Sequence, residues 1–97
     1  MEIPKPENGK ITIYSKSGCP NCTKAKNLLK QKQKDYIIID CDEFILEDKE
    51  ELLKFMYSLI GKEWKTFPMI FDENNFIGGY VEIEKYINNS LDFNTEF

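Results

Sequence analysis

Two cysteines, Cys19 and Cys22, stand three positions apart where an apolar, β-branched run gives way to a run with helical periodicity. Residues three apart on a helix face each other with about 5–6 Å between their Cβ atoms, close to the range that a disulfide tolerates. Pro20 fits the first helical position, because its missing N–H group would have no partner inside the helix. A helix N-terminus also favours a thiolate through its free N–H groups. The pattern predicts a dithiol that opens and closes, with Cys19 as the outer residue.

Two alternatives to a redox dithiol stay open at this point. A structural zinc site normally takes four cysteine or histidine ligands, and this chain offers one further cysteine, Cys41, and no histidine. Two inert core cysteines are the second alternative, which Gly18 and Pro20 at a strand-to-helix corner do not favour. Cys41 itself is interpreted as a small core residue, with an oxidation-sensitive thiol as the alternative. We therefore predict catalytic cysteines and no metal site.

The composition of the chain limits the classes of function that it can have. The chain has 97 residues, enough for one domain with a single core. Its 13 basic residues are all lysine and it has no histidine, which excludes a Cys–His pair and a histidine acid or base. A net charge of −4 with scattered lysines does not support nucleic-acid binding. No run approaches the roughly 18 apolar residues of a membrane span. The odd number of cysteines favours a reducing cytoplasm, or a host cytoplasm if the source is viral.

The apolar periodicity predicts elements in the order β-α-β-α-β-β-α. The unbroken apolar strand is expected to be covered on both faces. Strands are expected over residues 10–14, 36–39, 67–71 and 76–77, and helices over 23–34, 47–60 and from Gly78-Gly79 to Leu91. We expect one domain over residues 10–92, a flexible lead-in over 1–9 and a frayed end over 93–97.

Three further features carry chemistry, and each has a plain alternative. Lys16 is near enough to Cys19 to favour a thiolate or hold an anion, or it is a solvated surface lysine. Phe67–Pro68 opens a predicted strand, where a cis peptide bond would free the Phe67 backbone for an extended thiol peptide, or where proline only marks a strand edge. The double glycine before Val81 and Glu82 begins a helix that can receive a carboxylate, or it is only a tight turn.

Together and in this order, these features resemble the glutaredoxins over residues 10–91. The family pattern is Lys-x-x-Cys-Pro-x-Cys, then Thr-x-Pro, then a double glycine followed after two residues by an acidic residue, and the chain meets each part. The resemblance implies an α/β thioredoxin fold: a four-stranded mixed sheet flanked by helices, with the third strand antiparallel to the first and the Pro68 peptide bond cis and facing the thiols. It also implies glutathione as co-substrate in a groove lined by Lys16, Cys19, Asn21, Lys65, Phe67, Pro68, Val81 and Glu82.

Three positions depart from the family pattern. Asn21 stands where dithiol members usually carry Tyr or Phe, which leaves the thiol pKa and the substrate preference open. The loop before Thr66 is slightly longer than usual, so either Lys62 or Lys65 supplies the second cation. Glu82 replaces the more frequent Asp and should still accept a bond from the glutathione amine.

We therefore predict a monomeric, glutathione-dependent thiol–disulfide oxidoreductase that acts on protein disulfides and glutathionylated proteins and requires no metal. Cys19 would attack and Cys22 would resolve. An alternative is an iron–sulfur carrier, in which two chains bridge a [2Fe–2S] cluster through Cys19 and glutathione sulfur. A redox-inactive interaction module on the same fold is the third possibility.

Overall fold

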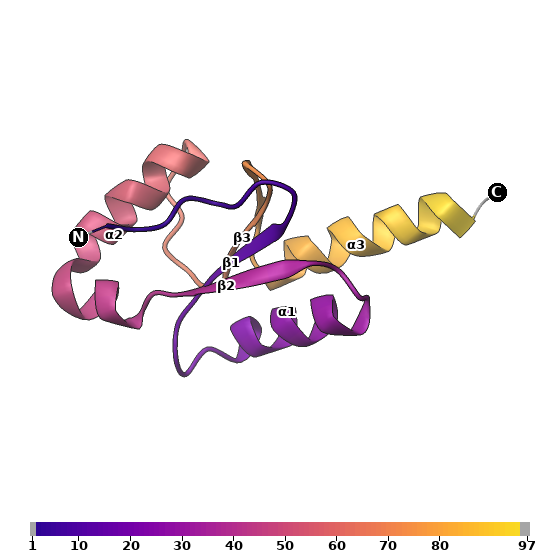
Figure 1. Cartoon of the computed structure of the whole chain (residues 1–97), viewed down its shortest axis with the longest axis horizontal. Helices are drawn as coiled ribbons and strands as arrows, with labels where there is room; N and C mark the ends of the chain where they lie inside the picture. The colour runs from indigo at the N-terminus through magenta and orange to yellow at the C-terminus, as the bar shows by residue number, and fades with distance from the viewer. Residues whose placement is uncertain (1, 96–97) are drawn as a thin grey trace.

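The structure is a computed structural model that describes residues 2–95, with the side chains of residues 2–89. It shows an α/β domain with one four-stranded sheet in the order β2-β1-β3-β4. The elements in chain order are β1 (Ile11–Ser15), α1 (Pro20–Gln31), β2 (Tyr36–Asp40), α2 (Asp42–Ile60), β3 (Met69–Asp72), β4 (Asn75–Gly78) and α3 (Tyr80–Thr95). Helices α1 and α3 cover one face of the sheet and α2 covers the other (Figure 1).

The sheet is mixed, as the resemblance implied. β1 pairs in parallel with β2, with Ile11 opposite Tyr36, and antiparallel with β3, with Tyr14 opposite Met69. β3 and β4 form an antiparallel hairpin. The predicted α/β class, thioredoxin-type topology and order of elements are therefore confirmed.

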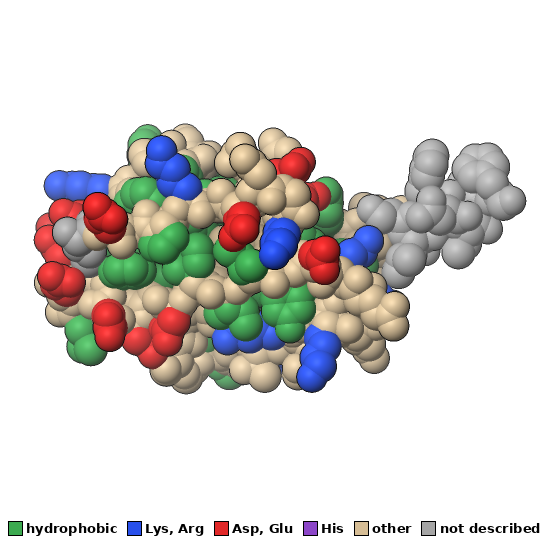
Figure 2. All heavy atoms as spheres, viewed as in Figure 1, with side chains coloured by type: hydrophobic (Ala, Val, Ile, Leu, Met, Phe, Trp, Pro, Cys, Tyr) green, Lys and Arg blue, Asp and Glu red, His purple; other side chains and the backbone are tan. Residues whose placement is uncertain are grey.

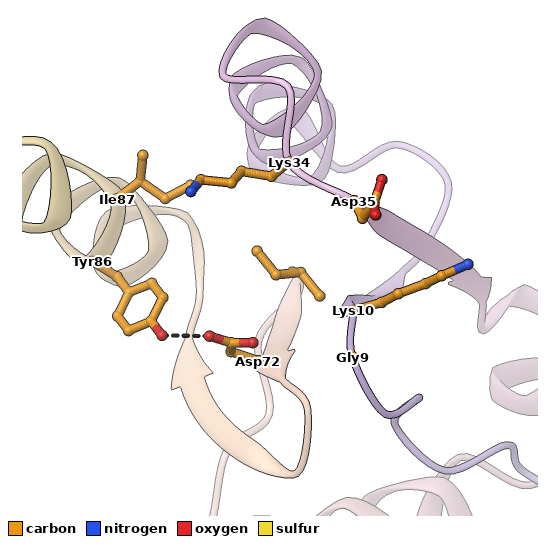
Figure 3. Close-up of a pocket in the computed structure, with 8 residues that line it drawn as sticks. Gly9, Lys10, Lys34, Asp35, Asp72, Tyr86 and Ile87 are labelled. Carbon is orange, nitrogen blue, oxygen red and sulfur yellow. Dashed lines mark hydrogen bonds between the residues drawn. The ribbon is translucent and has the colours of Figure 1, made fainter.

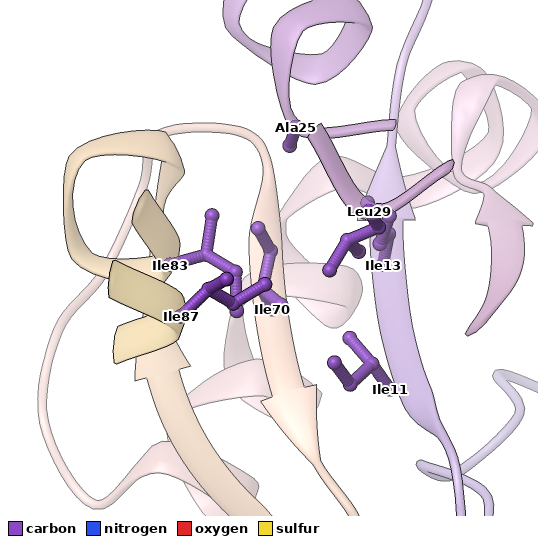
Figure 4. Close-up of a cluster of buried hydrophobic side chains, with 7 residues drawn as sticks. All are labelled: Ile11, Ile13, Ala25, Leu29, Ile70, Ile83 and Ile87. Atoms are coloured by element: carbon purple, nitrogen blue, oxygen red, sulfur yellow. The ribbon is translucent and has the colours of Figure 1, made fainter. Parts of the chain in front are cut away.

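Two hydrophobic clusters hold the helices on the two faces of the sheet. On one face, Ile83 and Ile87 of α3 point toward Ile70 of β3 (Figure 4). That cluster is completed by residues of β1 and α1, namely Ile11, Ile13, Ala25 and Leu29. The other face joins buried side chains of the sheet to α2, namely Tyr14, Ile39, Cys41, Leu52, Met56, Met69 and Phe71. Because β1 contributes to both clusters, all five of its residues are buried, which fixes the end of β1 where the cysteine loop begins.

The expectation that the apolar strand at residues 36–39 is covered on both faces is wrong. β2 lies at one edge of the sheet, and Ile38 is 46% exposed while Ile39 on the opposite face is buried. The unbroken apolar run thus reflects one buried face and one partly open face. The strand order decides whether both faces of β2 are covered, and it depends on contacts between residues that are far apart in the sequence.

α2 begins earlier than its apolar spacing indicated. It is broken at Asp48, whose φ of −161° and ψ of 89° are not helical, and the Asp48 carboxylate accepts a hydrogen bond from the Glu51 N–H at 3.1 Å. The predicted helix over residues 47–60 corresponds to the part after this break. In the extra turn, Phe44 and Ile45 pack on the second cluster and Leu46 is 86% exposed, so the turn lacks a regular apolar stripe.

The two ends of the chain were expected to be a flexible lead-in and a frayed end. Within residues 2–9, Ile3 packs against the second cluster, and the Pro4 carbonyl accepts a hydrogen bond from the Tyr14 hydroxyl at 2.6 Å. α3 continues through Thr95, and residues 96–97 of the expected frayed segment lie outside the described residues. No helix in the described part of the chain has the length and apolar character needed to cross a membrane.

Candidate active site

The two cysteines of the motif meet at the start of α1. Cys19 is the N-cap residue, with an extended backbone, and Pro20 opens the helix. Gly18, with a positive φ of 67°, turns the chain from β1 into this cap. Cys19 and Cys22 form a disulfide with their Cα atoms 5.2 Å apart. Cys19 is partly exposed and Cys22 is 1% exposed, so Cys19 is the outer sulfur, as predicted.

One backbone N–H group of the first helical turn donates to the outer sulfur, and a second donates to the carbonyl of the same residue. The Cys22 N–H donates to Cys19 Sγ at 3.1 Å. The Thr23 N–H donates to the Cys19 carbonyl at 3.2 Å. Hydrogen bonds from helix N–H groups stabilise a negative sulfur more than a neutral one. The same donor is therefore in place to stabilise a Cys19 thiolate when the disulfide opens.

The Phe67–Pro68 corner leads into β3, which pairs with β1, and it lies beside Cys19. The peptide bond between the two residues is cis, and Cys19 Sγ lies 3.5 Å from the Phe67 carbonyl oxygen. Pro68 is buried. The Phe67 backbone thus borders the disulfide directly, although the two residues are far apart in the chain.

A groove of about 410 Å³ opens beside the disulfide. It combines parts of the α1 start with the segment before β3, and is lined by Lys16, Gly18, Cys19, Pro20, Asn21, Lys65, Thr66 and Phe67. The Lys16 ammonium lies 5.8 Å from the centroid of the Phe67 ring. Five residues predicted from sequence therefore line one groove, and two lysines and one sulfur of the disulfide are among them.

The family model for glutaredoxins matches residues 11–77, more than half of the 97 residues. The chain belongs to the glutaredoxin family. Glutaredoxin 1 of Rickettsia conorii is 42% identical over 69 residues, which cover 71% of this chain and 63% of the relative. The chain thus spans less than two thirds of that relative's length.

Two solved glutaredoxins have similar folds. Glutaredoxin 1 from Francisella tularensis, in complex with cacodylate, matches with a TM-score of 0.72 at 24% identity, over 86% of this chain and 96% of that chain. A buckwheat glutaredoxin in complex with glutathione matches with a TM-score of 0.66 at 26% identity, over 84% of this chain and 71% of that chain. The four-stranded glutaredoxin fold is therefore shared across these proteins.

Val81 and Glu82 do not line the groove of this glutaredoxin. Val81 is 52% exposed, and Glu82 Oε1 accepts a hydrogen bond from the Gly79 N–H at 2.8 Å. A Cβ on Gly78 would lie 2.6 Å from Glu82 Cγ, and one on Gly79 would lie 3.5 Å from the Pro68 carbonyl oxygen. The start of α3 is therefore next to Pro68, which also does not line the groove.

The two lysines that the sequence left undecided lie in different places. Lys65 lines the groove beside Thr66 and pairs loosely with Glu63, with 4.0 Å between their charged atoms. Lys62 instead places its ammonium 5.8 Å from the Trp64 ring centroid. Of the two, Lys65 is thus the cation on the disulfide side of the loop.

The third cysteine of this glutaredoxin is a core residue. Cys41 is fully buried in the cluster beneath α2. Burial, reinforced by the charges of Asp40 and Asp42, raises the pKa of Cys41 to about 12. The Cys41 thiol is therefore protonated at neutral pH. In the described part of the chain, no group of three His, Cys, Asp or Glu side chains is close enough together to hold a metal ion.

Two of the other hollows help to delimit the groove. One, of about 220 Å³, shares Lys16, Gly18 and Cys19 with the groove but opens toward β2, past Lys26 and Ile38. The other, of about 260 Å³, lies at the opposite end of the sheet and is lined by Lys34, Asp72 and Tyr86 among others (Figure 3). There the Tyr86 hydroxyl donates to the Asp72 carboxylate, which raises the pKa of Tyr86. Neither cysteine of the disulfide lines this distant hollow.

Sequence reasoning missed one pair of residues near the disulfide. Ser17, in the loop before Cys19, donates to the carboxylate of Asp42 at the start of α2 through both its N–H and its hydroxyl. The available signal was an acidic residue two positions after a strand that ends beside this loop. Gly18, Pro20 and Thr66 also line the groove, and each adjoins a residue that was predicted.

Proposed function

We propose that this chain is a glutathione-dependent thiol–disulfide oxidoreductase that reduces protein disulfides and glutathione mixed disulfides. The observation that carries the proposal is the Cys19–Cys22 disulfide at a helix start, opening onto a groove with two lysines. A dithiol that closes without rearranging α1 can pass two electrons to a partner and be reduced again. Membership of the glutaredoxin family supports the same reaction.

In the one-thiol reaction, the Cys19 thiolate attacks the glutathione sulfur of a mixed disulfide. The bond to the substrate sulfur breaks, and the substrate leaves as a thiolate that takes up a proton. A second glutathione thiolate then attacks the glutathione on Cys19, which releases oxidised glutathione and restores the Cys19 thiolate. The Cys22 N–H, 3.1 Å from Cys19 Sγ, stabilises that thiolate as attacking and as leaving group.

In the two-thiol reaction, the Cys19 thiolate attacks one sulfur of a protein disulfide and forms a mixed disulfide with it, while the S–S bond of the substrate breaks and the other sulfur leaves as a thiolate that takes up a proton. Cys22, one turn further into α1, attacks Cys19 Sγ, which frees the second substrate thiol and closes the Cys19–Cys22 disulfide. Two glutathione molecules then reopen this disulfide and leave as oxidised glutathione. The buried position of Cys22 suits a residue that reacts only with Cys19.

The groove suits a tripeptide with two carboxylates. Lys16 and Lys65 stand on its walls and the Phe67 backbone borders the sulfur, so an extended thiol peptide can pair with main chain while its carboxylates meet ammonium groups. The similar buckwheat protein was solved as a glutathione complex. We place the amino end of glutathione toward Pro68, Val81 and Glu82, where Glu82 would exchange its bond to Gly79 for one to the amine.

Two cysteine variants test the proposed function. Cys19→Ser should reduce turnover of both a small glutathione mixed disulfide and a protein disulfide by more than about a hundredfold, because the nucleophile is lost. Cys22→Ser should keep turnover of the mixed disulfide and lose reduction of the protein disulfide. The Cys41→Ser variant serves as a control that changes one thiol outside the groove. Retained mixed-disulfide turnover in purified Cys19→Ser protein would falsify the proposal.

A matched lysine pair tests the groove. Lys65→Gln should raise the KM for the glutathione mixed disulfide by about threefold, since one exposed charge contact is lost. Lys62→Gln removes the same charge a few residues away, over the Trp64 ring, and should leave KM unchanged. Equal effects of the two substitutions would show that general charge, rather than the position of Lys65 in the groove, matters.

An iron–sulfur carrier is the second candidate, and Asn21 is the observation that favours it. Asn21 is exposed on the groove wall beside Cys19, so no aromatic side chain at this position fills the space. Cys19 and glutathione sulfur from two chains would hold such a cluster. Anaerobic reconstitution tests this: a brown dimer supports the carrier, and a colourless monomer supports the oxidoreductase, which we propose to be monomeric and to work in a reducing cytoplasm.

A further inference from the structure

The loop between β1 and α1 joins two parts of the candidate site. Lys16, Ser17 and Gly18 are all exposed, and a Cβ on Gly18 would have nothing within 4 Å. Lys16 extends into the groove over the Phe67 ring, and Gly18 leads into Cys19. The packing of the loop itself therefore does little to fix the position of the Lys16 ammonium.

The carboxylate of Asp42, at the start of α2, binds this loop at its central residue, Ser17. Asp42 Oδ1 accepts the Ser17 N–H at 2.8 Å, and Asp42 Oδ2 accepts the Ser17 hydroxyl. Asp42 is in turn held by its own N–H, which donates to Asp40 Oδ1 at 2.9 Å. The neighbouring Cys41 N–H donates to the Ser15 carbonyl at 2.8 Å. The junction of β2 and α2 thus holds both the last residue of β1 and the loop that follows it.

The charge of the carboxylate strengthens this contact. The two hydrogen bonds from Ser17, with a smaller contribution from the charge of Lys16, lower the pKa of Asp42. Asp42 therefore remains ionised at neutral pH, and hydrogen bonds to an ionised acceptor are stronger than those between neutral groups. Because both donors belong to one residue, the contact fixes the direction of the main chain on either side of Ser17.

We propose that Asp42 is a positioning residue, which through Ser17 holds the Lys16 ammonium in the groove ready for the carboxylate of a glutathione-bearing substrate. The inference rests on the proposed function. A loop that is ordered before binding loses less conformational entropy when the substrate arrives. Loss of the Asp42 contact should therefore weaken substrate binding and leave the chemical step at Cys19 unchanged.

Steady-state kinetics with the mixed disulfide of glutathione and β-mercaptoethanol provides the test. Asp42→Ala should raise KM by up to about threefold with kcat unchanged, because the effect is limited to the loss of one exposed charge contact. Glu43→Ala is the matched control. Glu43 stands in the same first turn of α2, so its substitution removes the same charge without breaking the contact to Ser17. Ser17→Ala breaks the hydroxyl bond without touching α2 and should raise KM about twofold, and Ser17→Thr should restore it.

A double-mutant cycle shows whether Asp42 acts through Lys16. If it does, adding Asp42→Ala to Lys16→Gln should raise KM no further than Lys16→Gln alone. Multiplicative effects of the two substitutions, or a KM for Asp42→Ala equal to that of Glu43→Ala, would overturn the inference. A wild-type protein without mixed-disulfide turnover would instead overturn the proposed function, so the two failures are distinct. Ser17→Ala keeps the test decisive if Asp42→Ala does not fold.

Discussion

Cys19 and Cys41 occupy equivalent positions in two helices, because each is an N-cap residue, Cys19 of α1 and Cys41 of α2. Their sulfur atoms nevertheless lie in different surroundings. Cys19 Sγ accepts a hydrogen bond from the Cys22 N–H at 3.1 Å and borders an open groove. Cys41 is fully buried, and its Sγ lies 3.7 Å from the Ile39 carbonyl oxygen instead of capping the described turns of α2.

The charges near the two helix starts also differ, and this difference too favours a thiolate at Cys19 over one at Cys41. The first turn of α1, described in full, has no acidic residue. Asp42 and Glu43 stand in the first turn of α2, and Figure 2 shows acidic side chains gathered at the end of the molecule where α2 begins. A helix N-terminus therefore favours a thiolate only where the sulfur meets the helix N–H groups, stays near solvent and has no carboxylate beside it.

The largest expected effect is a difference in alkylation rate between these two cysteines. With a pKa of about 12, roughly one Cys41 thiol in a hundred thousand is ionised at neutral pH, and burial further limits access. Iodoacetamide should therefore label Cys19 in reduced, folded protein at least about a thousandfold faster than Cys41. Peptide mass spectrometry of the Cys22→Ser variant measures both rates without disulfide closure.

The control for this experiment is the same protein in urea. There both cysteines lose their surroundings, so their labelling rates should converge to within about tenfold. Comparable labelling of Cys19 and Cys41 in the folded protein would remove the contrast on which the comparison depends.

The start of α1 could be predicted because its signals are local. Pro20 after Cys19 and the apolar spacing that follows mark a helix start within a few residues. The sheet topology and the cis corner were implied by the family pattern, which joins three short motifs that lie far apart in the chain. Lys16, Asn21, Lys65 and Phe67 could be placed in one groove by the same route.

The parts that could not be predicted depend on long-range contacts. The edge position of β2 follows from the strand order of the sheet. An unbroken apolar run such as residues 36–39 does not indicate that order. The Ser17–Asp42 contact joins residues 25 positions apart. Glu82 is a different case, because an acidic residue three positions after a helix-starting Gly79 is a local capping signal, and it was assigned to substrate binding alone.

The second prediction is a loss of stability at high pH that belongs to Cys41. Its pKa is raised from 9.0 to about 12 in the folded protein. Between these values the unfolded chain releases the proton and the folded protein keeps it. The contribution of Cys41 to the free energy of unfolding is therefore fully present below pH 9.0 and decreases as the pH rises toward about 12. The slope is at most about 1.4 kcal/mol per pH unit.

Urea unfolding of the oxidised protein and of its Cys41→Ala variant measures this loss, since the closed disulfide leaves Cys41 as the titrating thiol. Burial also raises the pKa of Tyr14, and Tyr14 is present in both proteins, so the difference between their curves reports mainly on Cys41. Parallel curves across the window from pH 9.0 to about 12 would show that the Cys41 pKa is not raised.

The smallest expected effect is that of Cys41→Ala at neutral pH. The Cys41 side chain fills space in the cluster beneath α2 with Leu52, Met56 and Phe71, so its removal should lower the free energy of unfolding by about 1 kcal/mol. Turnover should stay within about twofold of wild type, because this sulfur does not border the groove. Urea unfolding and mixed-disulfide kinetics measure the two quantities on the same preparation. A loss of turnover larger than the unfolded fraction explains would give the buried cysteine a part in the reaction, and exposure would then no longer separate the two N-cap thiols.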